Sequence, residues 1–416
     1  MITTAPAFTA LETVDRLAAA LADPSTAWPG GRPDGGRSWP QSLAGGASGI
    51  ALLHIERART GHGDWDIAHD WLKAAVHGEV SAAANANANL YFGAPALAYV
   101  MHRATSASSR YLPVLARLDT ATLTLTGNRL AAAHQRITRA ERPLMEEFDL
   151  IRGLSGLGAY HLSRHPHHAI TSDVIAYLVR LTEPIPDPAG LPPWWTDVAP
   201  SGVLHPDYPG GHGNVGLAHG IGSTLAVLSQ ALLGGLTVPG TADAIARICS
   251  WTDQWRQADE TALWWPGHLS IQQVTDGQVH SSLRPRPSWC YGVSGTARAQ
   301  QLAGLALGDS AGVVMAENAI LAALQDPFQL DTLPETGLCH GMAGLLHAAW
   351  RMATETDNPE ISAELPRLTD RLITALSQSD PNPELLGGQA GAALALHTVG
   401  TGRAPAPHWD TFLALA

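Results

Sequence analysis

Apolar stretches rich in small residues recur along the chain, and each follows a glycine-rich turn. Clear examples are residues 50–54, 345–349 and 392–396. A helix that is apolar on all sides must be buried, so these stretches predict inner helices. The segments between them are amphipathic and carry most of the charge, as in residues 66–80, 242–257 and 360–378. Each repeat is therefore predicted to pair one inner helix with one outer helix.

Seven turns share the pattern of a glycine, two residues, and a second glycine or small residue. Their first glycines are Gly46, Gly93, Gly153, Gly220, Gly292, Gly341 and Gly388. Successive first glycines lie 47 to 72 residues apart, which leaves room for two helices and their connections. We therefore predict an all-α fold: an α/α toroid of seven inner and outer helix pairs, formed by one domain over residues 1–416.

The longest gaps between turns predict additional structure. Residues 184–214 are rich in Pro and Gly, and residues from about 265 to 288 form a second insertion; both are expected to be elaborated loops. Within the second insertion, Asp276-Gly277 separates two extended-looking runs. This pattern predicts a β-hairpin over residues 269–280.

Composition narrows the class of protein. Hydrophobic residues make up 45% of the chain and charged residues 15%, as expected for a globular protein. The net charge of −12 argues against nucleic acid as a partner. Three cysteines do not form a disulfide framework, and neither a signal peptide nor a membrane span is recognised. We therefore expect a cytoplasmic protein.

Two of the three cysteines occupy the same place in successive repeats. Cys290 and Cys339 each lie two residues before the first glycine of a turn, and His340 follows Cys339. In a toroid the turns before the inner helices converge at one end, so these residues are expected to meet. Two thiolates and one imidazole suit zinc, and three protein ligands leave a fourth position open. Cys249, within an amphipathic segment, is predicted to be a core residue.

Two further polar residues fall near the same end. His219 precedes Gly220, and Asp149 lies four residues before Gly153. An open zinc position activates either water or a substrate thiol. A thiolate-rich site is the poorer Lewis acid, which favours sulfur chemistry over hydrolysis without excluding the latter.

Four motifs together resemble the lanthipeptide cyclase (LanC-like) family. They are Trp-Cys-Tyr-Gly at 289–292, Cys-His-Gly at 339–341, residues 148–160 and Gly-Leu-Ala-His-Gly at 216–220. The motifs follow the family's order, and the resemblance covers nearly the whole chain. It implies the same α/α toroid that the repeats predict, in a stand-alone cyclase without a dehydratase-like region.

The resemblance also implies an activity. Cys290, Cys339 and His340 would bind Zn²⁺, and a cysteine of a precursor peptide would be the fourth ligand. Its thiolate would add to dehydroalanine or dehydrobutyrine and form lanthionine or methyllanthionine rings. His219 would protonate the resulting enolate, with Asp149 as its partner.

Arg286 and Tyr291 complete the set of catalytic residues that the resemblance implies. Arg286 would offset the charge of the enolate, and Tyr291 would assist in the same pocket. Structural roles stay open for every member: His219 as a helix cap, Asp149 as a helix-end residue, Arg286 as a rim ion pair, Tyr291 as packing. Arg284 is an alternative to Arg286.

The implied partners are a dehydrated precursor peptide, with leader and core, and a separate dehydratase. The resemblance also leaves room for a membrane-associated biosynthetic complex. Two alternative functions remain at this point. One is the addition of glutathione to dehydrated residues of proteins; the other is a non-catalytic toroid that binds peptides and uses zinc only for stability.

Overall fold

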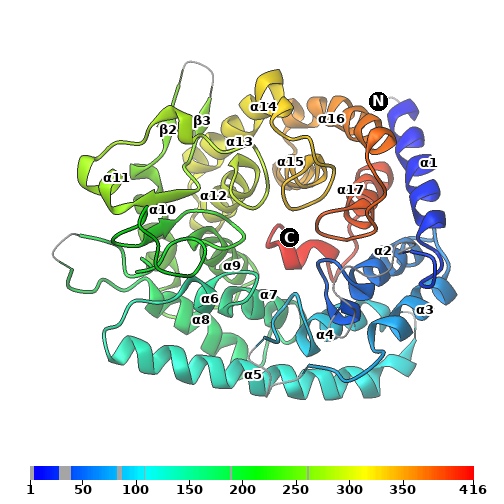
Figure 1. Ribbon diagram of the computed structural model, residues 1–416, viewed down its shortest axis with the longest axis horizontal. Coiled ribbons are helices and arrows are strands. Elements are labelled where there is room, and N and C mark those ends of the chain that lie inside the picture. Colours follow the sequence, from blue (N-terminus) through cyan, green and yellow to red (C-terminus); the bar gives the residue numbers. More distant parts are fainter. Residues whose placement is uncertain (1–3, 28–38, 82–86, 107, 188–189, 260–261) are drawn as a thin grey trace. The chain divides into compact units, whose positions relative to one another are not determined.

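The computed structural model describes residues 4–27, 39–81, 87–106, 108–187, 190–259 and 262–416. Helices dominate, and the chain divides into two compact units (Figure 1). The first unit comprises Met1–Leu125 and Leu333–Asp410, and the second comprises Thr126–Thr332 and Thr411–Ala416. The single domain over residues 1–416 stays a prediction.

Each of the seven predicted turns leads directly into a helix, and the first glycine of the turn is the residue that caps it. These inner helices are α2 (Ala47–Arg59), α4 (Ala94–Ala104), α7 (Leu154–Arg164), α9 (Ile221–Leu233), α12 (Val293–Leu307), α15 (Met342–Thr356) and α17 (Gln389–Thr401). Most of their residues are buried, as expected for helices that are apolar on all sides. The prediction of seven inner helices is thus confirmed.

The outer helices of the first unit are amphipathic. They are α1 (Thr4–Ala20), α3 (Trp65–Ala75) and α16 (Pro359–Gln378), joined by the beginning of α5 (Leu112–Thr138). In this unit α2 contacts α3, α15 contacts α16, and α17 contacts α1. The N-terminus of α3 is fixed by Asp64, whose carboxylate accepts the backbone N–H of Asp66.

The second unit repeats this arrangement. Its outer helices are α8 (Ala169–Leu181), α10 (Thr241–Gln254) and α13 (Ser310–Gln325), with the short helices α6 (Met145–Phe148) and α14 (Pro327–Asp331) beside them. The inner helix α9 contacts both α7 and α12, and α7, α9 and α12 contact α8, α10 and α13 in turn.

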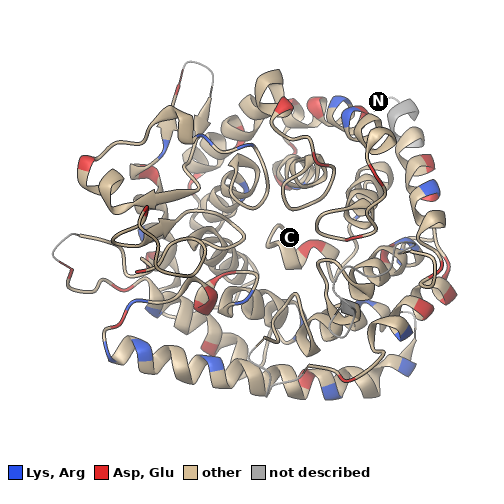
Figure 2. Cartoon of the chain, viewed as in Figure 1, with Lys and Arg blue, Asp and Glu red and all other residues tan. Residues whose placement is uncertain are grey.

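Charge distinguishes the outer helix α16 from the inner helices α9 and α17. Figure 2 shows acidic and basic positions along α16, whereas α9 and α17 carry none. Other inner helices do bury charged side chains, such as Arg103 on α4 and Arg298 on α12, and the guanidinium of each donates to backbone carbonyl groups. No helix in the described part of the chain is long and apolar enough to cross a membrane.

The strands are few and short. β1 (His212–Asn214) pairs antiparallel with β4 (His268–Ser270), and β2 (Gln257–Ala258) pairs antiparallel with β3 (Leu263–Trp264). The hairpin predicted over residues 269–280 is wrong, because helix α11 (Ile271–Asp276) follows β4 directly. A capping box between Ser270 and Gln273 starts this helix, and Gly277 in the left-handed conformation ends it.

The paired glycines of the turn before α12 are required by space. Gly292 has an extended backbone, yet a Cβ there would lie 2.1 Å from the carbonyl oxygen of Arg286. A Cβ on Gly295 would lie 2.0 Å from the carbonyl oxygen of Trp289. The turn thus folds back on the first turn of α12, with its backbone where side chains would otherwise stand. The Gly-x-x-Gly pattern reflects this close approach.

Candidate metal and proton-transfer site

Within the second unit, backbone hydrogen bonds connect three successive turns. The N–H of Leu150 donates to the carbonyl of Ala218 at 3.2 Å, and the N–H of Ala218 donates to the carbonyl of Cys290 at 3.2 Å. Ala218 and Cys290 occupy the same position in their repeats, two residues before the capping glycine. The repeat therefore holds the turns of Asp149, His219 and Cys290 side by side.

Asp149 and His219 form a close pair. His219 Nδ1 lies 2.6 Å from Asp149 Oδ2, and Asp149 Oδ1 accepts the backbone N–H groups of Arg152 at 2.6 Å and Gly153 at 2.8 Å. The side chain of Asp149 is 1% exposed and that of His219 is 33% exposed. The buried carboxylate holds the proton of the ring on Nδ1, so Nε2 is the nitrogen available for proton exchange.

Tyr291 lies beside this pair. Its ring centroid is 6.3 Å from that of His219, with 27° between the two planes. A Cβ on Gly216 would lie 2.5 Å from Tyr291 Cδ1, so this glycine makes space for the phenol ring. The ring centroid of His268 lies 4.7 Å from that of Tyr291.

The turn of Cys290 is anchored through its neighbour. Trp289 is fully buried, and its Nε1–H donates to the carbonyl of Leu413 at 3.0 Å. The guanidinium of Arg298, on α12, donates to the carbonyl of Leu415 at 3.0 and 2.9 Å. Residues near the end of the chain thus fix the tryptophan that precedes Cys290.

Cys339 and His340 lie in the corresponding turn before α15, in the first unit. The N–H of Cys339 donates to the carbonyl of Leu386 at 2.9 Å, and the N–H of Leu386 donates to that of Ala44 at 2.8 Å. These bonds repeat, in this unit, the connection between turns seen in the second. A Cβ on Gly341 would lie 2.5 Å from the carbonyl oxygen of Glu335, so this turn is equally tight.

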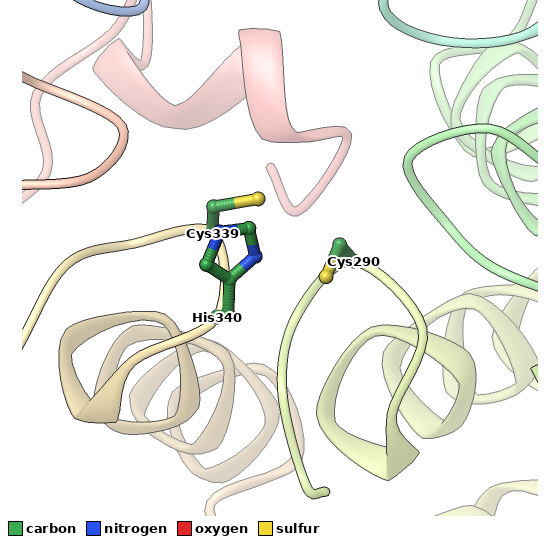
Figure 3. A group of neighbouring side chains, drawn as sticks. All are labelled: Cys290, Cys339 and His340. Carbon is green, nitrogen blue, oxygen red and sulfur yellow. The ribbon is translucent and has the colours of Figure 1, made fainter. Parts of the chain in front are cut away.

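The three predicted zinc ligands form a group (Figure 3). The sulfur atoms of Cys290 and Cys339 and a ring nitrogen of His340 all lie within 4.8 Å of one another. Among the described residues, this is the one such group of three or more His, Cys, Asp or Glu side chains. Its two sulfurs and one nitrogen match the preferences of Zn²⁺, so the donor set fits this ion.

Cys249 stands apart from this chemistry. It lies in α10, and burial raises the pKa of its thiol to about 12. The thiol is therefore protonated at neutral pH and is a poor nucleophile and metal ligand. The prediction of a core residue holds only in part, because the side chain of Cys249 is half-buried.

The two arginines before Cys290 differ in their partners. Arg284 Nη1 lies 3.0 Å from Asp259 Oδ2, and Nη2 lies 4.0 Å from Asp326 Oδ2. The carbonyl of Arg286, two residues later, accepts the N–H of Ser288 at 2.7 Å. The ion pairs give Arg284 a structural part, and the catalytic role of Arg286 stays a prediction.

Two histidines of the site could not be found from the sequence. His212 and His268 lie on β1 and β4, and their rings are 5.6 Å apart. The only signal would have been the pairing of two short strands more than fifty residues apart, in segments expected to be loops. Three further histidines lie within residues 165–168, close to one another in sequence. One of them, His168, has a structural role, because its Nδ1 accepts the N–H of Ile170 and caps α8.

Comparisons with known proteins agree with this arrangement. Residues 37–413 match the family model described as "Lanthionine synthetase C-like protein". The chain is 26% identical over 205 residues to the nisin biosynthesis protein NisC of Lactococcus lactis subsp. lactis, and the match spans 48% of each protein. The chain thus covers about half the length of this curated relative.

The structure is also similar to the solved structure of nisin cyclase. The TM-score is 0.78 at 18% sequence identity, and the likeness covers 97% of both chains. This confirms the predicted all-α fold of the α/α toroid type. Because the family model spans most of the sequence, including all four motifs, the chain belongs to the lanthionine synthetase C-like protein family.

Proposed function

We propose that this protein is a zinc-dependent lanthipeptide cyclase. Its substrate would be a dehydrated precursor peptide, and its products would be lanthionine and methyllanthionine rings. The observation that carries the proposal is the donor set of Cys290, Cys339 and His340, whose ligand atoms lie within 4.8 Å of one another. Family membership and the Asp149–His219 pair support it.

These three residues would hold Zn²⁺ and leave one tetrahedral position for a substrate. Bound there, the ion would supply the charge that deprotonates a peptide thiol. Two cysteine ligands already donate negative charge, which keeps a coordinated sulfur nucleophilic. This donor set therefore suits thiol addition better than the activation of water.

The remaining chemistry is proton transfer, and the residues of the second unit can perform it. The thiol sulfur bonds to the β-carbon of the dehydroamino acid, and the electron pair of the double bond passes to an enolate. His219 Nε2 would take up the proton that the thiol loses and then deliver it to the α-carbon, so the addition is balanced. Asp149 keeps the ring in place through its 2.6 Å contact with Nδ1.

Arg286 and Tyr291 would assist the enolate. A guanidinium near the developing oxyanion lowers its energy, and a phenol can donate a hydrogen bond. The position of Tyr291, next to Cys290 in sequence and with its ring centroid 6.3 Å from that of His219, supports this role. We further propose that a separate dehydratase supplies the substrate and that both enzymes act in the cytoplasm.

The test is incubation of the zinc-loaded protein with a dehydrated precursor peptide. Cyclisation is an isomerisation, so free thiols should disappear while the mass of the peptide stays constant. The same peptide with unmodified Ser and Thr is the control, and its thiols should persist.

Two other outcomes would overturn the proposal. In a parallel incubation that also contains glutathione, addition of one glutathione to the peptide, with the peptide's own thiols retained, would favour the glutathione-adding alternative. Binding of the peptide without any loss of thiols would favour the non-catalytic alternative.

A further inference from the structure

His268 lies beside the proton-transfer pair but has no part in the chemistry proposed above. It is on β4, where it pairs with Asn214 of β1, and the N–H of Val215 donates to the carbonyl of Gly267 at 3.1 Å. β1 runs directly into the turn that carries His219. The two-stranded sheet therefore ties the backbone of His268 to the turn of the catalytic histidine.

Tyr291 lies against this sheet and against the turn that follows β1. A Cβ on Gly216 would lie 2.5 Å from Tyr291 Cδ1, and one on Gly267 would lie 3.5 Å from Tyr291 Cβ. The ring of His268 is 4.7 Å from the phenol ring, with 42° between the planes. Gly216 thus leaves the space that the phenol occupies, Gly267 lies at ordinary van der Waals distance from Tyr291, and His268 supplies an aromatic neighbour.

His268 is an uncharged ring at this position. Burial, together with the nearby His212 and His219, lowers its pKa to about 3. Its Nε2 is buried and has no hydrogen-bond partner among the described residues, and the same holds for Nε2 of His212. A buried polar atom without a partner is destabilising, so the presence of this ring has a cost in stability.

We propose that His268 is a positioning residue for Tyr291. Its imidazole ring fixes the phenol in the orientation that faces His219, by packing alone. The kinetic part of this inference rests on the proposed cyclase function, whereas the position of the phenol does not.

The position of Tyr291 can be measured without any activity. The protein has seven tyrosines, so uniform labelling with 3-fluorotyrosine should give a small set of ¹⁹F signals, and Tyr291→Phe assigns the signal of interest. His268→Ala should shift or broaden that signal, and His268→Phe should leave it close to its original frequency. His205→Ala, at an exposed histidine of the same unit, is the matched control and should leave it unchanged.

Kinetics then tests the consequence for proton transfer. His268→Ala should lower kcat about tenfold with little change in KM, whereas His268→Phe should stay within about threefold of wild type. In a Tyr291→Phe background, His268→Ala should have little additional effect, because the two residues act as one unit. His268→Gln, which keeps polar atoms but lacks a ring, should behave like the alanine variant and provides a less drastic truncation.

Three results would overturn the inference. The first is an unchanged Tyr291 signal in folded His268→Ala or His268→Gln. The second is a His268→Phe variant as impaired as His268→Ala, which would assign the role to a ring nitrogen. The third is full additivity with Tyr291→Phe. If wild type forms no thioether, the cyclase proposal fails, and the ¹⁹F spectra still decide the role of His268.

Discussion

Asp149 holds His219 with one carboxylate oxygen and its own turn with the other. Oδ2 lies 2.6 Å from His219 Nδ1, and Oδ1 accepts the backbone N–H groups of Arg152 and Gly153. Asp149 thus stabilises the turn before α7 and also orients the ring of His219, which lies one repeat later in the sequence. The geometry is that of an acid or base with a fixed tautomer, of the kind that assists proton transfer in many enzymes.

Asp149→Asn should lower the rate of cyclisation by about 10²-fold, because the amide cannot hold the imidazole in the same protonation and orientation. Asn keeps one oxygen to accept the backbone N–H groups of the turn, so folding should persist. The measurement is thiol loss in a dehydrated peptide under single-turnover conditions.

His219→Ala is the companion variant. It should retain zinc and lose cyclisation, because His219 is not part of the metal-binding group. Turnover at the wild-type rate in this variant would remove His219 from the mechanism, and a loss of zinc would place it among the ligands.

Replacement of either cysteine in the metal group should release zinc. Cys290→Ala and Cys339→Ala each leave two protein ligands, and Zn²⁺ sites of this kind need at least three. The readout is zinc per protein by elemental analysis after dialysis.

Cys249→Ala serves as the matched control. It removes the third cysteine of the chain, a half-buried thiol in α10 whose pKa is raised to about 12, and should keep stoichiometric zinc. Retention of zinc by all three variants would contradict the ligand assignment.

The features that repeat along the chain could be predicted from the sequence. Gly292 and Gly341 begin turns in which a Cβ would collide with backbone atoms, and this steric demand explains the glycine that these turns share. Cys290 and Cys339 could be paired because they share one register relative to those glycines. The inner helices could be predicted because a helix that is buried on all sides consists mostly of apolar residues.

Local signals without a repeat were less informative. Asp276-Gly277 suggested a hairpin, but Ser270 and Gln273 form a capping box and Gly277 ends a helix. His268 carried no signal, because its place beside Tyr291 depends on the pairing of β4 with β1. Contacts made by strands distant in sequence leave no periodicity along the chain.

Gly292→Ala should destabilise the second unit and weaken zinc binding. The added Cβ would lie 2.1 Å from the carbonyl oxygen of Arg286, so the turn that carries Cys290 would have to move. Overpacking of this kind commonly costs about 1–3 kcal/mol. Differential scanning calorimetry and zinc titration measure the two effects.

Gly127→Ala is the opposite case and the control. Gly127 lies within α5, and a Cβ there would meet no atom within 4 Å. Alanine should stabilise this helix by roughly 0.5–1 kcal/mol and leave zinc binding unchanged. Equal behaviour of the two variants would show that the glycine of the turn is not required by space.

Stability should fall between pH 6.5 and pH 4, in part because of His54. Its Nε2 lies 2.9 Å from the carbonyl of Leu21, and burial lowers its pKa to about 4. Within this window the unfolded chain binds a proton at His54 that the folded protein does not, so acid favours unfolding. The contribution is fully present above pH 6.5, declines as the pH falls, and stops changing below about 4.

His54→Gln should remove this dependence at one site. Between pH 7 and pH 5, the decrease in the free energy of unfolding should be smaller than in wild type by about 2 kcal/mol, as proton linkage at a single group gives. Urea unfolding at the two pH values measures it. His205→Gln, at an exposed histidine, should leave the wild-type decrease intact. Burial also lowers the pKa of His397 to about 4, so part of the acid sensitivity should persist in His54→Gln. If His54→Gln showed the full wild-type decrease, His54 would have to accept a proton in the folded state as readily as in the unfolded chain.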